Sequence, residues 1–294
     1  MKTIQKLSLA LMLPFIIWSC GPGTTTETSE TTEEIVEESV EPSLTMLWET
    51  SEELITNESV LVDENSGKIY VANIEGNPTE KDGKGSISII NKAGEIIENV
   101  WISGIDAPKG MGISNGKLYV TNIDELVEID LETAQISNRI AVEGAQFLND
   151  VDTDGGKVYF SDMNTGKIHL FENGNLSLFA EGQEGINGLR IGNDGTVYGL
   201  DAAGLKKYNS EGSFEIINSV VTGGDGLIIL DENTFLASRW QGEIYIIQNG
   251  QETKLLDTTA AESNTADIGY MAEENIVFVP TFFKNKVAAY KLNY

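Results

Sequence analysis

The sequence predicts an all-β protein, a six-bladed β-propeller whose last blade is closed by an N-terminal strand. Three observations carry this prediction: a β-rich unit recurs six times in the 294 residues, each copy is followed by a second strand candidate, and turns rich in Gly, Asn and Asp separate the copies. Helical periodicity is not evident. Four short strands in about 40 residues are typical of a propeller blade, so six copies indicate six blades.

The first element of the repeat is a turn followed by a β-rich run. Its six copies are Gly67-KIYVAN, Gly116-KLYVTN, Gly156-KVYFSD, Gly195-TVYGLD, Asn233-TFLASR and Asn275-IVFVPT. The fourth residue of each copy is aromatic or leucine, at Tyr70, Tyr119, Tyr159, Tyr198, Leu236 and Phe278. The intervals between these residues are 49, 40, 39, 38 and 42 residues, which fits one blade per copy. We expect these side chains to pack one blade against the next.

A second strand follows in every copy: GSISII from Gly85, ELVEID from Glu125, GKIHLF from Gly166, GLKKYN from Gly204, GEIYII from Gly242 and KVAAYKL from Lys286. The first five copies also have a further strand candidate, such as 100–102 or 176–179, whereas the sixth ends at Tyr294 without one. We expect residues 44–48 to supply this missing strand, because closing the ring removes the exposed edges of a linear array.

The N-terminus has the pattern of an export signal. Lys2 and Lys6 precede an apolar run of 12 residues, shorter than the roughly 20 needed to span a bilayer. The run ends at Ile17-Trp18-Ser19-Cys20, which resembles a bacterial lipobox, so we predict a lipoprotein-type signal peptide over residues 1–20 with lipid attached at Cys20. This predicts a domain in the bacterial cell envelope, anchored to the membrane and facing the periplasm or the surface. An ordinary cleaved signal is the alternative.

Charge and composition define the next segment and exclude several functions. Residues 24–41 contain seven Glu and no Lys or Arg, so we predict a disordered acidic Thr/Glu linker over 21–43 and a propeller over 44–294. The chain carries 46 acidic and 19 basic residues, a formal charge of −27, which argues against nucleic-acid binding. One Cys and one His exclude thiolate zinc clusters and His-pair metal sites. We expect a monomeric domain that takes a small-molecule substrate.

Each copy opens with a polar residue two positions before an alternating apolar pair. These six ring residues are Glu58, Lys109, Asn149, Asn187, Asp225 and Asp267. Equivalent positions of a propeller form a ring around its axis, so we expect them to face the central channel. Carboxylate and amide oxygens suit a hard cation, and Ca²⁺ better than Zn²⁺. Three carboxylates and one ammonium give a charge of −2, which a divalent ion balances. Strand openings that are polar because they meet solvent are the alternative.

Four stretches resemble signature sequences of the senescence-marker-protein, gluconolactonase and luciferin-regenerating-enzyme family: Glu58-Ser-Val-Leu-Val-Asp, Phe147-Leu-Asn149-Asp150, Ile186-Asn187-Gly-Leu and Gly224-Asp225-Gly-Leu. The resemblance implies a six-bladed propeller with one divalent cation in its tunnel, and lactone hydrolysis as in several members. It implies Glu58, Asn187 and Asp225 as metal ligands, Asn149 as a further ligand or substrate contact, and Asp225 as the catalytic acid–base residue. The sugar-lactone members have an arginine where this chain has Phe147.

The leading hypothesis is therefore a divalent-metal-dependent, gluconolactonase-like hydrolase of a lactone or related cyclic ester. Lys109, Asn149 and Asp267 are the expected substrate contacts. Two alternatives stay open. One is a non-catalytic, envelope-anchored binding propeller with a structural calcium, which Phe147 favours, and the other is phosphoester or organophosphate hydrolysis at the same site.

Three further patterns are interpreted as structural. The run from Asp150 to Gly155 begins like an EF-hand loop, but Ser161 stands where that loop needs Glu, so the run predicts a turn. Ser114 matches a nucleophile-elbow formula, but Asn115-Gly116 predicts a hairpin. His169 aligns with Tyr245 and Ser88 of sibling blades, which indicates a structural position.

Overall fold

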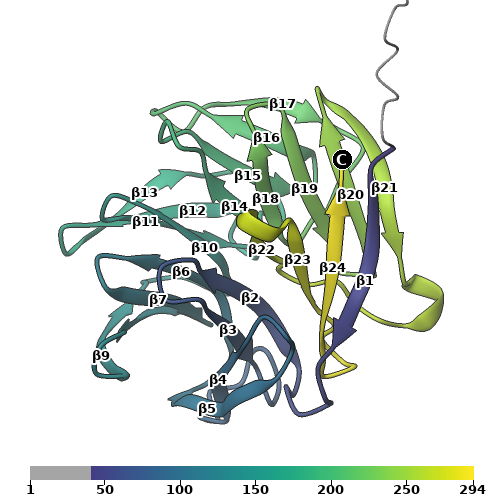
Figure 1. The fold of residues 1–294 in the computed structure, drawn as a ribbon. Coiled ribbons are helices and arrows are strands. Elements are labelled where there is room, and N and C mark those ends of the chain that lie inside the picture. The colour runs from purple at the N-terminus through teal and green to yellow at the C-terminus, as the bar shows by residue number, and fades with distance from the viewer. Residues whose placement is uncertain (1–40) are drawn as a thin grey trace, which may run out of the picture. The chain divides into compact units, whose positions relative to one another are not determined.

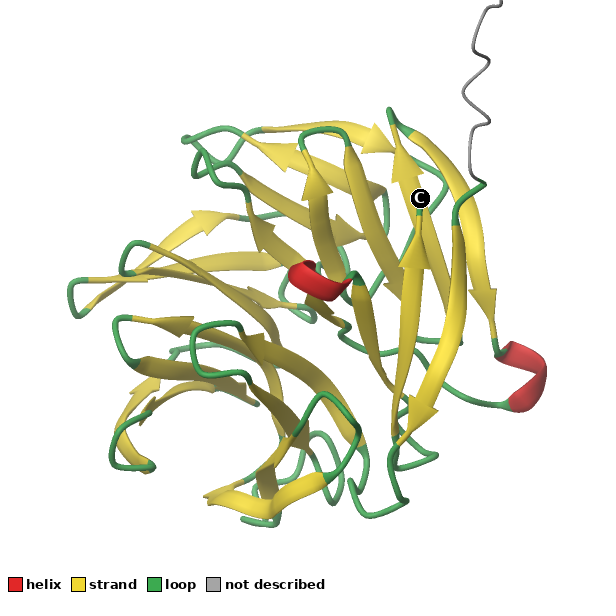
Figure 2. Cartoon of the chain, in the orientation of Figure 1, coloured by secondary structure: helices red, strands yellow, loops and turns green. Residues whose placement is uncertain are grey.

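The computed structural model describes residues 41–294, and the predictions for the signal peptide, for Cys20 and for most of the linker lie outside the described residues. In this part of the chain, six four-stranded antiparallel sheets form a ring, a six-bladed β-propeller (Figure 1). The predicted fold class is confirmed. The helical elements within 41–294 are two single turns, η1 (Thr259–Ala261) and η2 (Ala272–Glu274), which Figure 2 shows in red. Neither these nor any other described segment forms a helix able to cross a bilayer.

The first five blades each use four consecutive strands, from the axis outward. Blade 1 contains β2 (Asn57–Asp63), β3 (Lys68–Asn73), β4 (Gly85–Ile90) and β5 (Ile96–Ile105), and blade 2 contains β6 (Pro108–Ser114), β7 (Lys117–Asn122), β8 (Glu125–Asp130) and β9 (Gln135–Ala141). Blade 3 contains β10 (Leu148–Asp154), β11 (Lys157–Asp162), β12 (Lys167–Glu172) and β13 (Asn175–Ala180). Blade 4 contains β14 (Leu189–Ile191), β15 (Val197–Asp201), β16 (Gly204–Tyr208) and β17 (Phe214–Asn218), and blade 5 contains β18 (Leu227–Asp231), β19 (Thr234–Arg239), β20 (Glu243–Gln248) and β21 (Gln251–Asp257).

Blade 6 combines strands from both ends of the described chain. Its strands are β22 (Gly269–Met271), β23 (Ile276–Pro280), β24 (Val287–Asn293) and β1 (Ser43–Glu49). Strand β1 pairs antiparallel with β24, from Ser43 opposite Asn293 to Glu49 opposite Ala288, and Figure 1 shows the purple and yellow strands side by side. A parallel bridge between Ser59 and Asp267 joins blade 6 to blade 1, so the ring is continuous.

The hydrophobic core lies between neighbouring blades. Tyr70 of β3 is buried in one cluster with Leu118 and Val120 of β7, which joins blades 1 and 2. The ring of Tyr198 in blade 4 lies 5.2 Å from that of Phe235 in blade 5. The recurring aromatic residue thus packs blade on blade, as predicted, and such buried aromatic pairs add to the stabilisation from apolar burial.

The inner strands of neighbouring blades approach each other closely next to the ring residues. A Cβ atom on Gly188, which follows Asn187, would lie 2.1 Å from the carbonyl oxygen of Asp225. A Cβ atom on Gly226, which follows Asp225, would lie 2.4 Å from the backbone nitrogen of Ile268. Only glycine permits this approach, so the Asn-Gly and Asp-Gly steps bring polar side chains of different blades together.

Hydroxyl groups of the second strands fix the backbone at the same level. The hydroxyl of Thr121 donates to the carbonyl oxygen of Asn149, and that of Ser161 donates to the carbonyl oxygen of Asn187 at 2.8 Å. In the same way Ser238 donates to Ala266, the residue before Asp267, at 2.8 Å. Each bond runs from one blade to the next, so neighbouring blades hold the ring residues in place.

Candidate functional site at the propeller axis

A cavity of about 490 Å³ lies at the axis and is lined by residues from all six blades. Five of the six ring residues line it: Glu58, Lys109, Asn149, Asn187 and Asp225. The first three lie in β2, β6 and β10, whereas Asn187 and Asp225 stand two positions before the first residues of β14 and β18. The repeat alignment therefore brings together side chains that are up to 167 positions apart in the sequence.

Three of these residues form the polar centre of the cavity. The amide nitrogen of Asn187 donates to Oδ1 of Asp225 at 3.0 Å. Within residues 41–294, Oε2 of Glu58 and Oδ1 of Asn187 are buried and have no hydrogen-bond partner. Only 4% of Glu58 and 3% of Asp225 are exposed. A buried oxygen without a partner is destabilising, so these two atoms indicate a place for a cation or a donor.

The two carboxyl groups of the cavity have raised pKa values. Burial and then the charges of Asp225 and Asp267 hold the pKa of Glu58 well above its usual range. Burial, followed by the charge of Asp267, raises the pKa of Asp225 to about 8, and the hydrogen bond from Asn187 opposes this rise. Negative charge is unfavourable here because neither carboxylate has a cationic partner in contact.

Lys109 is part of the cavity wall and only 1% exposed. Its Nζ donates to the carbonyl oxygens of Ala107 at 3.0 Å and Pro78 at 3.3 Å, and it lies 4.5 Å from the centre of the Phe147 ring. Burial lowers the pKa of Lys109 to about 8, although the charge of Glu58 favours the ammonium form. Backbone carbonyls and an aromatic face, rather than a carboxylate, thus hold this ammonium group.

Asp267, the sixth ring residue, is not part of the cavity wall. Its Oδ2 accepts a hydrogen bond from the Ser59 hydroxyl at 2.6 Å, and its Oδ1 lies 3.7 Å from Nη2 of Arg190. The carboxylates of Asp150, Asp267 and Asp152 all favour the charged guanidinium of Arg190 and raise its pKa. We call Arg190, Asp150, Asp152 and Asp267 the axial ion cluster. The carboxylate of Asp267 therefore faces Arg190 and not the cavity.

The sequence analysis missed this cluster and assigned two of its members to a turn. That assignment was wrong for Asp150 and Asp152, which lie in β10, and the turn falls at 155–156. Oδ2 of Asp150 accepts the backbone N–H of Leu189 at 2.6 Å, and Oδ2 of Asp152 accepts that of Ile191 at 2.7 Å. The spacing of two positions between Asp150 and Asp152 could have indicated this, because alternate residues of a strand lie on the same face of the sheet.

The cavity also has an apolar wall that the sequence analysis did not identify. One position beyond each copy of the repeat stands an apolar residue, and we call these six the apolar ring: Ile74, Ile123, Met163, Ala202, Trp240 and Phe282. All except Ile123 line the cavity. Ile123 is buried in a cluster with Ile74 and Phe282. The sequence signal for this wall is the apolar residue that directly follows the aligned part of each copy.

The donor atoms at the cavity fit a hard divalent cation. In residues 41–294 no three or more His, Cys, Asp or Glu side chains are placed to hold a metal ion. The candidate set instead combines the carboxylates of Glu58 and Asp225 with the amides of Asn149 and Asn187, all at one cavity. Oxygen ligands of both kinds suit Ca²⁺, and the two buried oxygens without partners belong to this set.

Comparisons with known proteins support the fold. No family model and no curated protein matches the chain. Similar solved structures include a streptogramin B lyase, with 13% identity, coverage of 86% of this chain and 98% of that chain, and a TM-score of 0.61. A nidogen/laminin complex shows 14% identity, coverage of 74% and 85%, and a TM-score of 0.61. Virginiamycin B lyase from Staphylococcus aureus shows 14% identity, coverage of 86% and 100%, and a TM-score of 0.57.

These structures share the fold with this chain at low sequence identity. Their names describe two lyases and one protein complex, so the propeller serves both catalysis and binding. The class that fold and site define here is a six-bladed propeller with an acidic, partly apolar axial cavity. Its activity has to be argued from the side chains of that cavity.

Proposed function

We propose that this propeller is a divalent-metal-dependent hydrolase of a lactone or related cyclic ester, with Ca²⁺ as its ion. The observation that carries the proposal is the meeting of two buried oxygens without partners, Oε2 of Glu58 and Oδ1 of Asn187, with the carboxyl group of Asp225 in one cavity. Glu58, Asn187 and Asp225 would hold the ion, and Asn149 would be a further ligand or a substrate contact. The resemblance of four stretches to the lactonase-containing family points to the same residues.

The chemistry divides between the ion and the side chains. When bound, a divalent cation polarises a carbonyl oxygen and stabilises the negative charge that develops on it. Asp225 accepts a proton from the water that attacks the carbonyl carbon, and the Asn187 amide fixes the orientation of the Asp225 carboxylate. The bond between this carbon and the ring oxygen then breaks, the ring oxygen takes up the proton, and the product is a hydroxy acid.

Lys109 has a positioning role in this proposal. Because two backbone carbonyls hold its Nζ, the ammonium group has a fixed place in the wall beside Phe147. From there it orients the ester group and favours the carboxylate of the product. At the level of the cell, the proposal includes a lipid anchor at Cys20, which would keep the enzyme at the bacterial envelope.

A panel of lactones, assayed after metal removal with added Ca²⁺ or with EDTA, tests the proposal. We expect turnover with Ca²⁺ and its loss in EDTA. Asp225→Asn should lower the turnover rate by about 100-fold or more, as expected for a general base, without lowering the melting temperature. Asp231→Asn is the matched control, because Asp231 is an exposed carboxylate of the same blade. Hydrolysis that is unaffected by EDTA would reject the mechanism.

A non-catalytic binding propeller with a structural calcium is the second candidate. The apolar ring favours it, because apolar side chains contribute affinity but no chemistry. In that case no lactone is hydrolysed, and Asp225→Asn keeps the ligand. Nitrophenyl phosphate esters in the same panel test phosphoester hydrolysis, the third candidate.

A further inference from the structure

Three aromatic rings gather at one side of the axial cavity. The ring centroids of Trp240 and Phe282 are 5.5 Å apart, those of Trp240 and Phe283 6.0 Å, and those of Phe282 and Phe283 4.7 Å, all nearly perpendicular. Trp240 and Phe282 line the cavity. Trp240 is 38% exposed and Phe283 is 63% exposed. This aromatic cluster therefore extends from the cavity wall to the solvent, where large apolar groups often mark a binding site.

The loop that carries Phe282 and Phe283 is fastened to the strand that carries Glu58. The backbone N–H of Phe282 donates to Oδ1 of Asn57, the neighbour of Glu58, at 2.8 Å. Oδ1 of Asn285 accepts the backbone N–H of Thr56 at 2.8 Å. Phe282 has a φ of +51°, a conformation that bulky residues rarely adopt. The bonds on both sides keep the Phe282 ring in the cavity wall despite this unfavourable backbone conformation.

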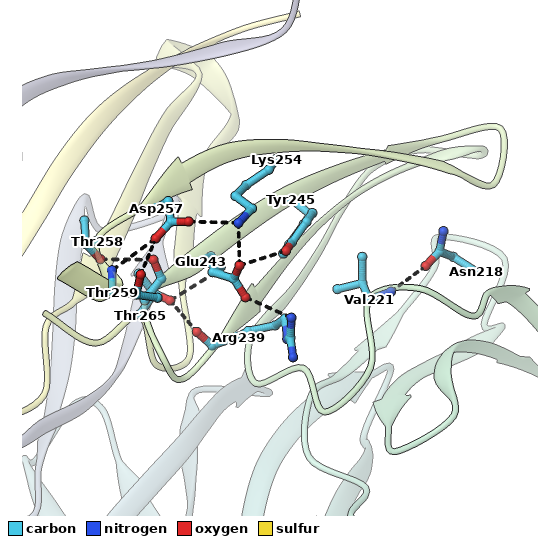
Figure 3. Close-up of polar contacts among 11 residues, drawn as sticks. Asn218, Val221, Arg239, Glu243, Tyr245, Lys254, Asp257, Thr258, Thr259 and Thr265 are labelled. Atoms are coloured by element: carbon cyan, nitrogen blue, oxygen red, sulfur yellow. Dashed lines mark hydrogen bonds and ion pairs between the residues drawn. The ribbon is translucent and has the colours of Figure 1, made fainter. Parts of the chain in front are cut away.

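The backbone at Trp240 is fixed by polar contacts of blade 5, and Figure 3 shows those of its neighbour Arg239. The Thr265 hydroxyl donates to the carbonyl oxygen of Arg239 at 2.7 Å. The Asn264 amide donates to the carbonyl oxygen of Trp240 at 2.9 Å. The Arg239 side chain donates to Glu243 at 2.9 Å, and Glu243 also accepts a bond from Lys254 at 2.6 Å. The backbone on which Trp240 stands is thus rigidly held, so its ring needs little ordering when a ligand binds.

The rest of the cavity shows what kind of molecule fits against these rings. Ile74, Pro78, Phe147 and Met163 continue the apolar wall, while Glu58 and Asp225 lie at its polar part. A charged group placed against this apolar wall would lose its hydration without gaining a partner, which disfavours a charged substituent. Hydroxyl groups placed against the aromatic rings would lose their hydrogen bonds to water, which disfavours a polyhydroxylated ligand. About 490 Å³ is within the range of cavities that take molecules larger than a bare lactone ring.

We propose that the molecule bound in this cavity carries a neutral aryl or alicyclic substituent, and that Trp240 and Phe282 form the surface on which this ring packs, with Phe283 at its solvent side. The inference rests on the proposed function for the identity of the reacting group, an ester placed at Glu58 and Asp225. It adds the substrate class, a lactone with an apolar ring substituent rather than a sugar lactone.

Lactams test this inference without turnover, because their amide bond replaces the ester. We compare a phenyl-substituted δ-lactam with the unsubstituted δ-lactam by calorimetric titration of the calcium-loaded protein. The substituted compound should bind roughly 10- to 100-fold more tightly, in the range of one apolar group in a pocket. Trp240→Ala and Phe282→Gly should remove this preference. Phe214→Ala, which truncates an exposed aromatic ring on the outer strand β17, should keep it.

Phe282→Gly separates a binding role from a structural one. Glycine adopts a φ of +51° without strain, which offsets part of the packing lost with the buried ring, so this variant should still unfold cooperatively, at a lower temperature, and bind Ca²⁺ while losing the preference for the phenyl group. Equal affinity for both lactams, or a preference that survives in Phe282→Gly, overturns the inference. Selective binding of the phenyl compound by a protein that hydrolyses no lactone supports the inference and rejects only the proposed function. Calcium-dependent hydrolysis without a preference for apolar substituents supports the proposed function and rejects this inference.

Discussion

The axial cavity and the axial ion cluster contain the same kinds of acidic side chain, but only the cluster pairs a carboxylate with a cation of the protein, at Asp267 and Arg190. In the cluster, both oxygens of Asp150 accept backbone N–H groups, at 2.8 and 2.6 Å, and so do both oxygens of Asp152, at 2.8 and 2.7 Å. Burial raises the pKa of all three carboxyl groups of the cluster, and the charge of Arg190 opposes this rise in each of them. In the cavity, Glu58 and Asn187 each keep a buried oxygen without a partner. Among the described residues, Oδ1 of Asp267 in the cluster also accepts no hydrogen bond, but it lies 3.7 Å from the Arg190 guanidinium.

The difference locates the function. A cation and hydrogen bonds stabilise buried carboxylates, and the axial ion cluster has both, in Arg190 and in the backbone N–H groups that Asp150 and Asp152 accept. The cavity has Lys109 nearby, but its Nζ bonds to two backbone carbonyls instead of Glu58. An acidic site that the protein leaves unbalanced, and that opens into a cavity, is where a cation and a substrate are expected.

Replacing Arg190 should have the largest effect on stability. In Arg190→Met the three carboxylates of the cluster lose their cationic partner, and breaking a buried ion pair in this way costs about 3–5 kcal/mol. For a domain of this size we expect the melting temperature to fall by roughly 10 °C. Thermal and urea unfolding measure the change.

An exposed ion pair provides the control for this variant. Nζ of Lys81 lies 2.6 Å from Asp124, and 56% of the Lys81 side chain is exposed. Lys81→Met should change the free energy of unfolding by less than about 1 kcal/mol. If Arg190→Met is as stable as Lys81→Met, the carboxylates of the cluster do not depend on Arg190 and the comparison above fails.

Replacing Glu58 should have the next largest effect, and only when Ca²⁺ is present. At 100 times its dissociation constant, an ion that binds only the folded state stabilises it by about 2.7 kcal/mol. We expect Ca²⁺ to raise the melting temperature of the wild type and not of Glu58→Gln. In EDTA the variant should be at least as stable as the wild type, because a neutral amide replaces a buried carboxylate.

Glu98→Gln is the control for this measurement, since Glu98 is exposed on the outer strand β5. It should keep the full calcium-induced rise. An equal rise in Glu58→Gln would show that Ca²⁺ binds elsewhere, and the assignment of the cavity as the metal site would be abandoned.

The sequence predicted the cavity because repeat position determines place in a propeller. Alignment of the copies was enough to predict that Asn187, Asp225 and Glu58 lie together. In the structure Asn187 contacts Asp225, and Glu58 lines the same cavity. The contacts of Asp267 were not predictable in this way, because they involve the long side chain of Arg190. The alternation of residues in β14 does not show which other blade that side chain contacts. The loop around Phe282 depends on Asn57, a partner 225 positions away.

The apolar ring is a different case, because its sequence signal was as clear as that of the ring residues. Trp240 and Phe282 each follow the last aligned residue of their copy, as Ile74 and Met163 do. Six apolar residues at one repeat position predict a shared apolar surface by the same rotational argument that predicted the polar ring. Apolar residues at a repeat position carry no chemistry of their own, but substrate selection depends on such apolar contacts as well as on polar groups.

The smallest expected effect concerns His169, which tests whether an unpaired buried atom is by itself the mark of a site. Its Nε2 is buried without a partner in the described part of the chain, and its ring stacks on Phe160 with centroids 5.2 Å apart, but it lines neither the cavity nor the axial ion cluster. Burial lowers the pKa of His169 below its usual 6.5. The unfolded chain therefore takes up a proton first as the pH falls, so this contribution to stability is present above about pH 6.5 and is lost below it.

His169→Phe should remove this part of the pH dependence, change the free energy of unfolding at pH 7 by less than about 1 kcal/mol, and leave the calcium-induced rise in melting temperature unchanged. Because His169 is the single histidine of the chain, its imidazole signal in NMR spectra gives the pKa directly. A folded-state pKa above 6.5, or a calcium response lost in His169→Phe, would contradict the criterion used here. If the prediction holds, an unpaired buried atom indicates a site only where other ligand atoms converge on the same cavity, which is the property that separates Glu58 and Asn187 from His169.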